Sequence, residues 1–194
     1  MARVAGAVLA AGSGERMGLP KAGLVVDGTR LVDRAVAALR DGGCSPVIAV
    51  VPAGVDVDGA RVIVNPDPRR GMRSSLELAV DAAARGPEID ALAVLLVDTP
   101  GVGASCVRAV RDGWLPGRIA VAGYPSGRGH PTVMPLELWR AALSLAGPDE
   151  GAKALLAAQP DRIDVIAIAG DPTDLDTAAD LASWIARRDP RGRA

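Results

Sequence analysis

Seven consecutive apolar residues, Ala91 to Val97, constrain the fold of this chain more than any other stretch. A strand with one face in water alternates apolar and polar residues, whereas a strand covered on both faces is apolar throughout. The run therefore predicts a strand inside a mostly parallel sheet with helices on both faces. It ends at Asp98-Thr99-Pro100, a turn expected at the edge where the strands end.

Apolar strands and amphipathic helices alternate along the chain, which predicts a three-layer α/β/α sandwich of the Rossmann-like kind. The expected strands are 4–11, 46–51, 61–64, 91–97, 118–122 and 163–168. The expected helices are 29–41 with Thr29 as its cap, one starting near Ser74 or Ser75, 104–112, 136–145, 151–158 and 178–187. Right-handed crossovers would bring the loop after the first strand and the loop at Asp98 to one edge of the sheet. We expect one domain over residues 1–188 and a frayed tail over 189–194.

Composition excludes several classes of function. A net charge of −1 gives no basic character for nucleic acids or membrane surfaces. No apolar run approaches the ~20 residues of a membrane span, and the amino terminus lacks the form of a signal peptide. The two cysteines, Cys44 and Cys106, form no disulfide framework or metal-binding pattern. We therefore expect a cytoplasmic protein whose partners include neither nucleic acids nor membranes.

A glycine-rich loop follows the first expected strand. It contains Gly12, Gly14 and Gly18 together with two cations, Arg16 and Lys21. Glycines let backbone N–H groups approach a ligand closely, and cations suit phosphate oxygens. Lysine is rare in this chain, because 20 of its 22 basic residues are arginines. The loop therefore predicts a phosphate site in which the lysine has a chemical role.

The spacing excludes the two best-known glycine loops. A P-loop places Lys and Ser/Thr directly after its second glycine, but here Gly18 is followed by Leu19-Pro20-Lys21-Ala22. A dinucleotide-binding loop has the pattern Gly-x-Gly-x-x-Gly, but the last glycine comes one residue late. Asp33, the nearest acid at the required distance, falls inside an expected helix rather than at a strand end.

The stretch from Leu9 to Lys21, LAAGSGERMGLPK, resembles the signature loop of the MobA-like NTP transferases. Other stretches resemble the molybdenum cofactor cytidylyltransferase branch of that family. In chain order they are 65–76 (NPDPRRGMRSSL), 96–100 (LVDTP), 129–133 (GHPTV), 149–155 (DEGAKAL) and 174–181 (DLDTAADL). The resemblance covers nearly the whole chain. It implies a GT-A-like nucleotidyltransferase domain that moves a nucleoside monophosphate from an NTP to a phosphorylated acceptor and releases pyrophosphate.

The resemblance also implies roles for particular residues. Lys21, which would reach the α-phosphate, Arg16 and Asp98 would be catalytic. The nucleotide would be bound by Leu9, Ala10, Ala11, Gly12, Ser13, Gly14, Arg16, Lys21, Gly71, Ser74 and Ser75. Mg²⁺, which prefers carboxylates, phosphates and water, would be held by Asp98 with Asp176 or Asp174. His130 and Lys153 would bind the acceptor.

The same resemblance bears on the substrates. The Leu-Ala-Ala-Gly form of residues 9–12 favours CTP over GTP, and the implied acceptor is molybdopterin or the molybdenum cofactor. A molybdoenzyme or its chaperone is the implied protein partner. Thr99, Pro148 and residues 178–179 depart from the branch's pattern, so the identity of the acceptor stays open. The chain also resembles nicotine blue oxidoreductases, so an oxidoreductase on the same scaffold is the main alternative, and a non-catalytic nucleotide- or cofactor-binding module is another.

Each candidate residue also has a purely structural interpretation. The glycines could form an ordinary strand-to-helix loop, and Asp98 could cap a turn. Ser74, Ser75 and at least one of Asp174 and Asp176 could act as helix caps. His130, after a turn expected at 124–129, could be a hydrogen-bonded turn residue, and Lys153 a solvated helix residue.

Overall fold

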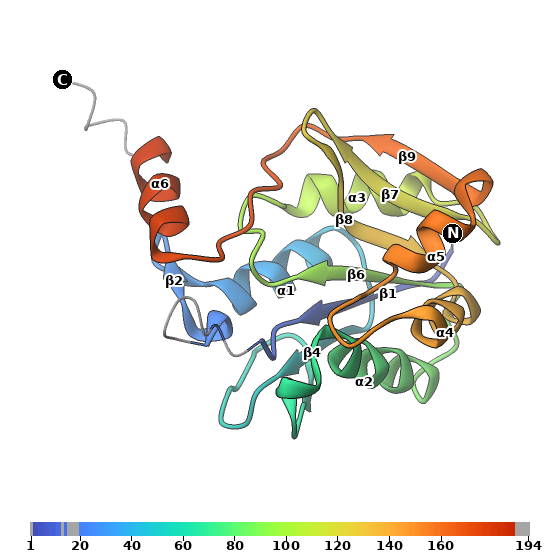
Figure 1. Ribbon diagram of the computed structural model, residues 1–194, viewed down its shortest axis with the longest axis horizontal. Coiled ribbons are helices and arrows are strands. Elements are labelled where there is room, and N and C mark those ends of the chain that lie inside the picture. The colour runs from blue at the N-terminus through green and yellow to red at the C-terminus, as the bar shows by residue number, and fades with distance from the viewer. Residues whose placement is uncertain (1, 13, 15–19, 189–194) are drawn as a thin grey trace.

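A computed structural model describes residues 2–12, 14 and 20–188 and contains one seven-stranded sheet, ordered β5-β4-β1-β6-β8-β7-β9 (Figure 1). The strands are β1 Val4–Leu9, β4 Val47–Val51, β5 Arg61–Val64, β6 Ala91–Leu96, β7 Ile119–Tyr124, β8 Gly127–Met134 and β9 Ile163–Ala167. Of these described strands, only β8 runs antiparallel to its neighbours. The expected mostly parallel sheet is confirmed.

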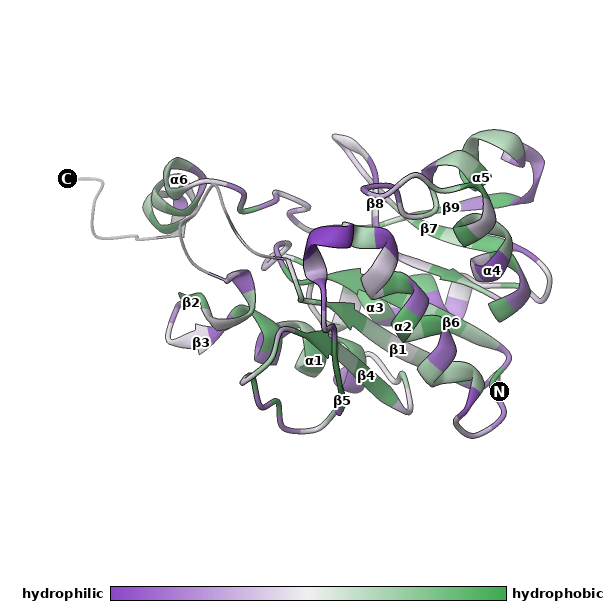
Figure 2. Ribbon diagram, turned by 60° about the horizontal axis from the view of Figure 1, so that its bottom comes forward, coloured by the Kyte–Doolittle hydropathy of each residue, from purple (hydrophilic) through white to green (hydrophobic). Residues whose placement is uncertain are grey.

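The side chains of each central strand alternate between two hydrophobic cores. In β1, Val4 and Val8 belong to one core, whereas Ala5, Ala7 and Leu9 belong to the other. Such alternation places apolar residues on both faces, which explains why these strands are apolar throughout. In Figure 2 the central strands are accordingly hydrophobic along most of their length.

Helices cover both faces of the sheet, which confirms the three-layer sandwich. Buried side chains of α1 (Leu31–Asp41) and α3 (Ala104–Gly113) complete the first core. Those of α2 (Met72–Ala84), α4 (Leu136–Leu145) and α5 (Lys153–Ala158) complete the second. None of the helices in the described part of the chain is long and apolar enough to cross a membrane.

The last helix, α6 (Ala178–Arg188), lies at the same end of the molecule as a small hairpin of β2 (Val25–Val26) and β3 (Thr29–Arg30) (Figure 1). Trp184 of α6 is fully buried in the first core, so this helix is anchored to the sandwich. The described part of the chain also contains three short 3₁₀ helices: η1 (Lys21–Gly23), η2 (Pro68–Arg70) and η3 (Pro160–Arg162).

Two local predictions differ from the structure. Thr29 does not cap α1; it pairs with Val26 in the hairpin, across a turn that Asp27 (φ 50°) and Gly28 (φ 77°) make in the left-handed region. The helix begins only at Leu31 and has no side-chain cap. His130 is not a turn residue, because β8 already begins at Gly127 and includes it. The expected tail, 189–194, lies outside the described residues.

Candidate active site

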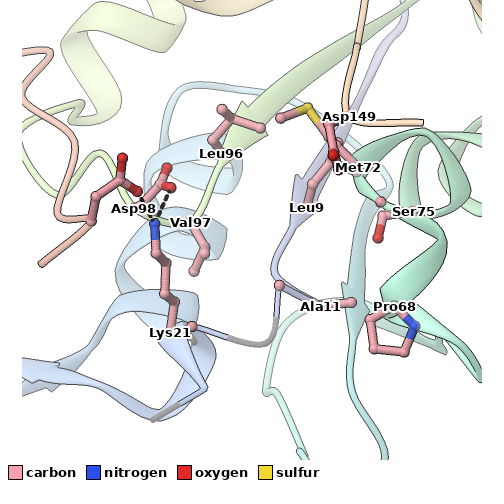
Figure 3. A pocket seen from close by; sticks show the side chains of 14 residues that line it. Leu9, Ala11, Lys21, Pro68, Met72, Ser75, Leu96, Val97, Asp98 and Asp149 are labelled. Atoms are coloured by element: carbon pink, nitrogen blue, oxygen red, sulfur yellow. Dashed lines mark hydrogen bonds and ion pairs between the residues drawn. The ribbon is translucent and has the colours of Figure 1, made fainter. Parts of the chain in front are cut away.

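Two neighbouring strands end level with each other and open onto a cleft. Leu9 at the end of β1 pairs with Leu96 at the end of β6, and the N–H of Val97 donates to the carbonyl of Leu9 at 3.3 Å. Segments that follow parallel strands meet at one edge of the sheet, as expected here from the sequence. The cleft at this edge has a volume of about 570 Å³ (Figure 3).

Lys21 bridges two carboxylates at one side of this cleft, as Figure 3 shows for Asp98. Its Nζ donates to Asp98 Oδ2 at 2.7 Å and to Asp176 Oδ1 at 2.5 Å. The Lys21 side chain is 13% exposed, Asp98 is 19% exposed and Asp176 is 49% exposed. Residues from the beginning, middle and end of the chain therefore share one cluster of charges.

The backbone brings Asp176 to this cluster. The N–H of Leu175 donates to the carbonyl of Asp98 at 2.9 Å, which holds the segment before α6 against the end of β6. Leu175 is itself fully buried, so the segment is anchored from both sides. The two residues of this hydrogen bond lie far apart in the sequence. Neither the stretch 96–100 nor the stretch 174–181 predicts the contact by itself.

Thr177, rather than one of the two aspartates before it, caps α6. The Thr177 N–H donates to Asp180 Oδ2 at 2.8 Å, and the Asp180 N–H donates to Thr177 Oγ1 at 3.2 Å. This reciprocal pair is a capping box. The structural interpretation of Asp174 or Asp176 as the cap is therefore wrong, because the side chains of Thr177 and Asp180 accept from the backbone N–H groups at the start of the helix.

The ionisation of the cluster follows from burial and charge. Burial would lower the pKa of Lys21, but hydrogen bonds to Asp176 and Asp98 and their negative charges raise it above its usual value, so the ammonium stays charged. Asp174 lies near both acids: partial burial raises the pKa of its carboxyl to about 6, and the charges of Asp98 and Asp176 act in the same direction. The site thus concentrates negative charge around a single lysine.

The donor set fits a divalent cation that keeps part of its coordination for a substrate. Asp98 Oδ1 is buried and has no hydrogen-bond partner among the described residues. The carboxylates of Asp98 and Asp176 already converge on one cationic nitrogen. The described residues include no group of three His, Cys, Asp or Glu side chains able to enclose a metal. A Mg²⁺-type ion here would take its remaining ligands from phosphates and water, as Mg²⁺ commonly does.

Three residues in the described part of the glycine loop line the cleft. Ala11, Gly12 and Gly14 line the cleft, and Gly14 has a φ of 63°, a conformation that favours glycine. Ala10 was expected to bind nucleotide, but it is fully buried and its N–H donates to the carbonyl of Val50 at 2.8 Å. That amide is therefore unavailable to a phosphate. The predictions for Ser13 and Arg16 lie outside the described residues.

A buried asparagine organises the opposite side of the cleft. Asn65 Nδ2 donates to Ser74 Oγ at 2.9 Å and to Ser75 Oγ at 3.0 Å, and Asn65 Oδ1 accepts from the Asp67 N–H at 3.0 Å. The serines do not cap α2, which has Gly71 at its N-cap position and no side-chain cap. Ser75 lines the cleft, whereas the Ser74 hydroxyl donates to the Gly71 carbonyl at 2.9 Å. Ser75 alone of the two is placed to contact a nucleotide.

Gly71 brings the start of α2 close to a loop from the second half of the chain. Its φ is 83°, and a Cβ at this position would lie 2.3 Å from the Pro148 carbonyl oxygen. The Arg73 N–H donates to the same oxygen at 3.0 Å. Asp149 consequently faces the cleft opposite Asp98, as Figure 3 shows.

A second cleft of about 540 Å³ adjoins the first. The two clefts share Leu9, Met72, Leu96 and Asp149. The two predicted acceptor-binding residues, His130 and Lys153, both line this second cleft. Two adjoining clefts of this kind provide room for a donor and an acceptor that meet at the shared wall.

Comparisons with known proteins identify the family of this chain. The model of the MobA-like NTP transferase domain matches residues 6–163. The chain belongs to the MobA-like NTP transferase family. It is therefore a nucleotidyltransferase, an enzyme class that uses nucleoside triphosphates and generally a divalent metal ion.

Among curated proteins, the "Nicotine blue oxidoreductase" of Paenarthrobacter nicotinovorans is 36% identical over 195 residues, covering 92% of this chain and 94% of that protein. The "Probable molybdenum cofactor guanylyltransferase" of Opitutus terrae is 35% identical over 130 residues, covering 64% of this chain and 62% of that protein. The expected resemblance to nicotine blue oxidoreductases is found. The expected resemblance to the molybdenum cofactor cytidylyltransferase branch is found only at the coarser level of molybdenum cofactor nucleotidyltransferases, because this relative is named a guanylyltransferase.

Among solved structures, Rv0371c of Mycobacterium tuberculosis superimposes with a TM-score of 0.80 at 26% identity, covering 95% of this chain and 98% of that one. The same protein is known as a complex with manganese, with a TM-score of 0.77, 25% identity and coverage of 95% and 98%. A structure described as a nucleotidyl transferase from Methanothermobacter superimposes with a TM-score of 0.76 at 20% identity, covering 96% of both chains, and confirms the nucleotidyltransferase-like fold expected from the sequence.

Sequence reasoning missed three residues: Asn65, which holds the Ser75 hydroxyl beside the first cleft, and two residues that line the clefts. Asn65 was detectable as the sole asparagine of the chain, placed just after a strand. Asp149 lies in a stretch whose resemblance was noticed without a role for that residue. Arg128 lines the second cleft but has no signal in a chain that contains 20 arginines.

Proposed function

We propose that this protein is a Mg²⁺-dependent nucleotidyltransferase that moves CMP from CTP to a phosphorylated acceptor and releases pyrophosphate. The observation that carries the proposal is the bridge from Lys21 to Asp98 and Asp176 beside two adjoining clefts. Transfer to a phosphate oxygen requires positive charge at the α-phosphate and an acceptor held in line with it. Both requirements can be met at the wall between the clefts.

The residues of the first cleft would divide the work as follows. The loop amides at Ala11, Gly12 and Gly14 would face the triphosphate, and Lys21 would exchange its carboxylate partners for α-phosphate oxygens. Because Ser75 Oγ accepts a hydrogen from Asn65, its own proton remains for donation to an acceptor atom of the base. These interactions bind the donor and stabilise charge that develops during the transfer.

Asp98 and Asp176 are the proposed metal ligands, with Asp174 in a supporting position. Mg²⁺ at this place would neutralise charge on the phosphates. Asp176 is favoured over Asp174 because its carboxylate already points to the same nitrogen as Asp98. Asp174→Asn should consequently reduce activity much less than Asp176→Asn.

The base and the acceptor are the finer parts of the proposal. CTP is proposed from the Leu-Ala-Ala-Gly form of residues 9–12, and the relative named as a guanylyltransferase makes GTP the competing donor. Molybdopterin or the molybdenum cofactor is the proposed acceptor, and a molybdoenzyme or its chaperone the proposed recipient of the product. We propose further that the domain comprises residues 1–188 and works in the cytoplasm.

Two measurements test this function. A thermal-shift series with the four NTPs and Mg²⁺ should show the largest stabilisation with CTP, because a ligand stabilises the fold that binds it. Pyrophosphate release with the acceptor present should fall at least about a hundredfold in Lys21→Ala and Asp98→Ala. Asp58→Ala, an exposed carboxylate outside both clefts, is the matched control. Full activity of the two site variants would refute the proposal. Stabilisation by GTP alone would mean that the donor nucleotide is GTP and not CTP.

An oxidoreductase on the same scaffold is the second candidate, since a relative with that name is 36% identical over 92% of this chain. It predicts a protein-dependent change in the absorbance of NADH or NADPH and no stabilisation by any NTP. A non-catalytic binding module would instead bind an NTP without releasing pyrophosphate.

A further inference from the structure

Strand β8 bulges at His130. Thr132 and Gly129, which are three positions apart on β8, pair with two neighbouring residues of β7. His130 and Pro131 therefore have no pairing partner among the described residues of β7, and the pairing with β6 also ends at Thr132. A bulge bends its strand and re-aims a side chain. Here the bulge contains the imidazole that lines the second cleft.

Tyr124 of β7 satisfies the carbonyl group that this bulge takes out of the sheet. Its Oη donates to the His130 carbonyl oxygen at 2.6 Å. Tyr124 is 6% exposed, and burial raises the pKa of its phenol, so the hydroxyl group keeps its proton and remains a donor. A carbonyl withdrawn from both the sheet and water needs such a partner.

The imidazole of His130 is held separately. Its Nδ1 lies 3.3 Å from the Val94 carbonyl oxygen, and because a carbonyl can only accept, Nδ1 carries the proton of the neutral ring. Burial lowers the pKa of His130, although the Val94 carbonyl and the charge of Asp98 act against this. The ring is therefore neutral near pH 7, with one tautomer fixed by the position of the bulge.

The ring of Tyr124 also contacts the segment that leads to Asp176. We call residues 168–176 the strap. A Cβ added at Gly170 of the strap would lie 3.3 Å from Tyr124 Cε1, and one added at Gly129, beside the bulge, would lie 3.1 Å from Cε2. The two edges of one aromatic ring thus lie against two backbone segments that have no side chain at the point of contact.

The strap is fixed on either side of this contact. The Ile168 N–H donates to the Gly123 carbonyl at 2.9 Å, and the Leu175 N–H donates to the Asp98 carbonyl at 2.9 Å. Gly170 lies between these two anchors, so the ring of Tyr124 supports the middle of the strap. One side chain therefore joins the bulge beside the second cleft to the strap beside the first.

We propose that Tyr124 is a positioning residue for nucleotidyl transfer. Its hydroxyl group fixes the bulge from which His130 faces the second cleft, and its ring sets the place of the strap that carries Asp176. Tyr124 itself lines neither cleft, so it acts through these two residues. The inference rests on the proposed function only for the reaction that the two residues serve.

The sole histidine of the chain is the reporter for this test. NMR of the imidazole nitrogens distinguishes the two neutral tautomers and the charged ring, and the wild type should show a proton on Nδ1. Tyr124→Phe removes only the hydroxyl group. We expect both neutral tautomers to be populated in this variant, and the pKa of His130 to rise toward its usual value, because the ring is no longer held at the Val94 carbonyl.

The charged groups around the imidazole are the same in this variant. The charge of Asp98 acts on the ring, and four charged side chains line the same cleft: Arg128, Asp149, Glu150 and Lys153. None of them is altered in Tyr124→Phe, so a change in the spectrum reports the position of the ring.

Trp114→Phe is the matched control. Trp114 is also 6% exposed, and its Nε1–H also donates to a backbone carbonyl, that of Arg118 at 2.9 Å, but it lines neither cleft. This variant loses a comparable hydrogen bond and should leave the spectrum of His130 unchanged. The comparison separates a loss of positioning from a general loss of stability.

A second variant tests the contact between the ring and the strap. Gly170→Ala adds a Cβ 3.3 Å from Tyr124 Cε1 and 3.0 Å from Cys106 Sγ, so these neighbours must shift. We expect it to alter the spectrum of His130 in the wild type but much less in the Tyr124→Phe background, where the ring is no longer bonded to the bulge. Gly103→Ala, with open space around its Cβ, should change nothing.

The reaction gives the functional readout. In Tyr124→Phe, kcat for pyrophosphate release from CTP with molybdopterin should fall about tenfold. Stabilisation by CTP and Mg²⁺ should persist, because the ring still supports the strap. An unchanged spectrum of His130 in Tyr124→Phe, the same change in Trp114→Phe, or an equal effect of Gly170→Ala in both backgrounds would overturn the proposal.

The same samples distinguish this failure from failure of the proposed function. The expected spectra without stabilisation by any NTP would support the positioning by Tyr124 and refute the nucleotidyl transfer. Pyrophosphate release from CTP with unchanged spectra would do the reverse.

Discussion

Lys21 lies between the two carboxylates of the proposed metal site, and this leads to a counterintuitive prediction for Lys21→Met. The lysine ammonium is the cation between the carboxylates of Asp98 and Asp176 when no ligand is bound. Removing it leaves two negative groups facing each other. We therefore expect the variant to be less stable than the wild type in EDTA but to gain more stability from Mg²⁺.

The exposed fractions set the size of the effect. Removing one partner of a buried ion pair costs about 3–5 kcal/mol. Because Asp176 is 49% exposed and water screens it, about 2–3 kcal/mol is the better expectation. For a chain of this length that loss lowers the melting temperature by roughly 5–10 °C. A metal at about a hundred times its Kd returns about 2.7 kcal/mol, which offsets the loss almost completely.

The assay is thermal unfolding in EDTA and across a Mg²⁺ or Mn²⁺ titration, without nucleotide. Lys153→Met is the matched control, since it removes the other lysine of the chain, which forms no ion pair among the described residues. Its melting curve should not respond to the metal more than that of the wild type. The reasoning is refuted if Lys21→Met has the same melting temperature as the wild type in EDTA, or if the metal stabilises it no more than it stabilises the wild type.

Three further predictions concern stability. Asn65→Ala removes hydrogen bonds to two serine hydroxyls and one backbone N–H, so urea unfolding should show a loss of about 2–3 kcal/mol; a loss under about 0.5 would contradict the buried network. Gly71→Ala forces a Cβ to within 2.3 Å of a carbonyl oxygen and should abolish NTP stabilisation, whereas Gly103→Ala, with open space around its Cβ, should not. Burial raises the pKa of the Cys44 thiol from 9.0 to about 11, so the folded state keeps a proton that the unfolded state loses. Stability should therefore fall by about 2 kcal/mol as the pH rises from 9 to 11, and Cys44→Ala should remove that part of the pH dependence; an unchanged profile would refute the assignment.

The parts of this protein that were predictable depend on local pattern and on topology. Apolar runs such as Ala91 to Val97 identify buried strands, and the rule for right-handed crossovers then brings the first loop to Asp98 without further information. A recognisable string such as Leu9 to Lys21 adds the family. The apolar runs, the crossover rule and the family resemblance all indicate the same fold. The predictions of the three layers and of the sheet edge that carries the site were therefore correct.

The remaining features depend on contacts between distant side chains. No sequence pattern predicts that Asp176 rather than Asp174 bonds to Lys21. The Leu175–Asp98 backbone bond and the Thr177–Asp180 cap fix the position of Asp176. The serines of α2 had two plausible interpretations, and both missed that one buried asparagine fixes their hydroxyl groups.

The bridge from Lys21 to Asp176 joins residues 155 positions apart, and it has a consequence for biosynthesis. Chains emerge from the ribosome amino terminus first, and early segments can begin to fold before later ones exist. The glycine loop and Asp98 would be complete well before the second carboxylate is made. The matched part of the family model ends at residue 163, so a protein trimmed to that boundary would keep the glycine loop and lack one side of the charge cluster. The charge cluster around Lys21 is therefore complete only after residue 176 has been translated.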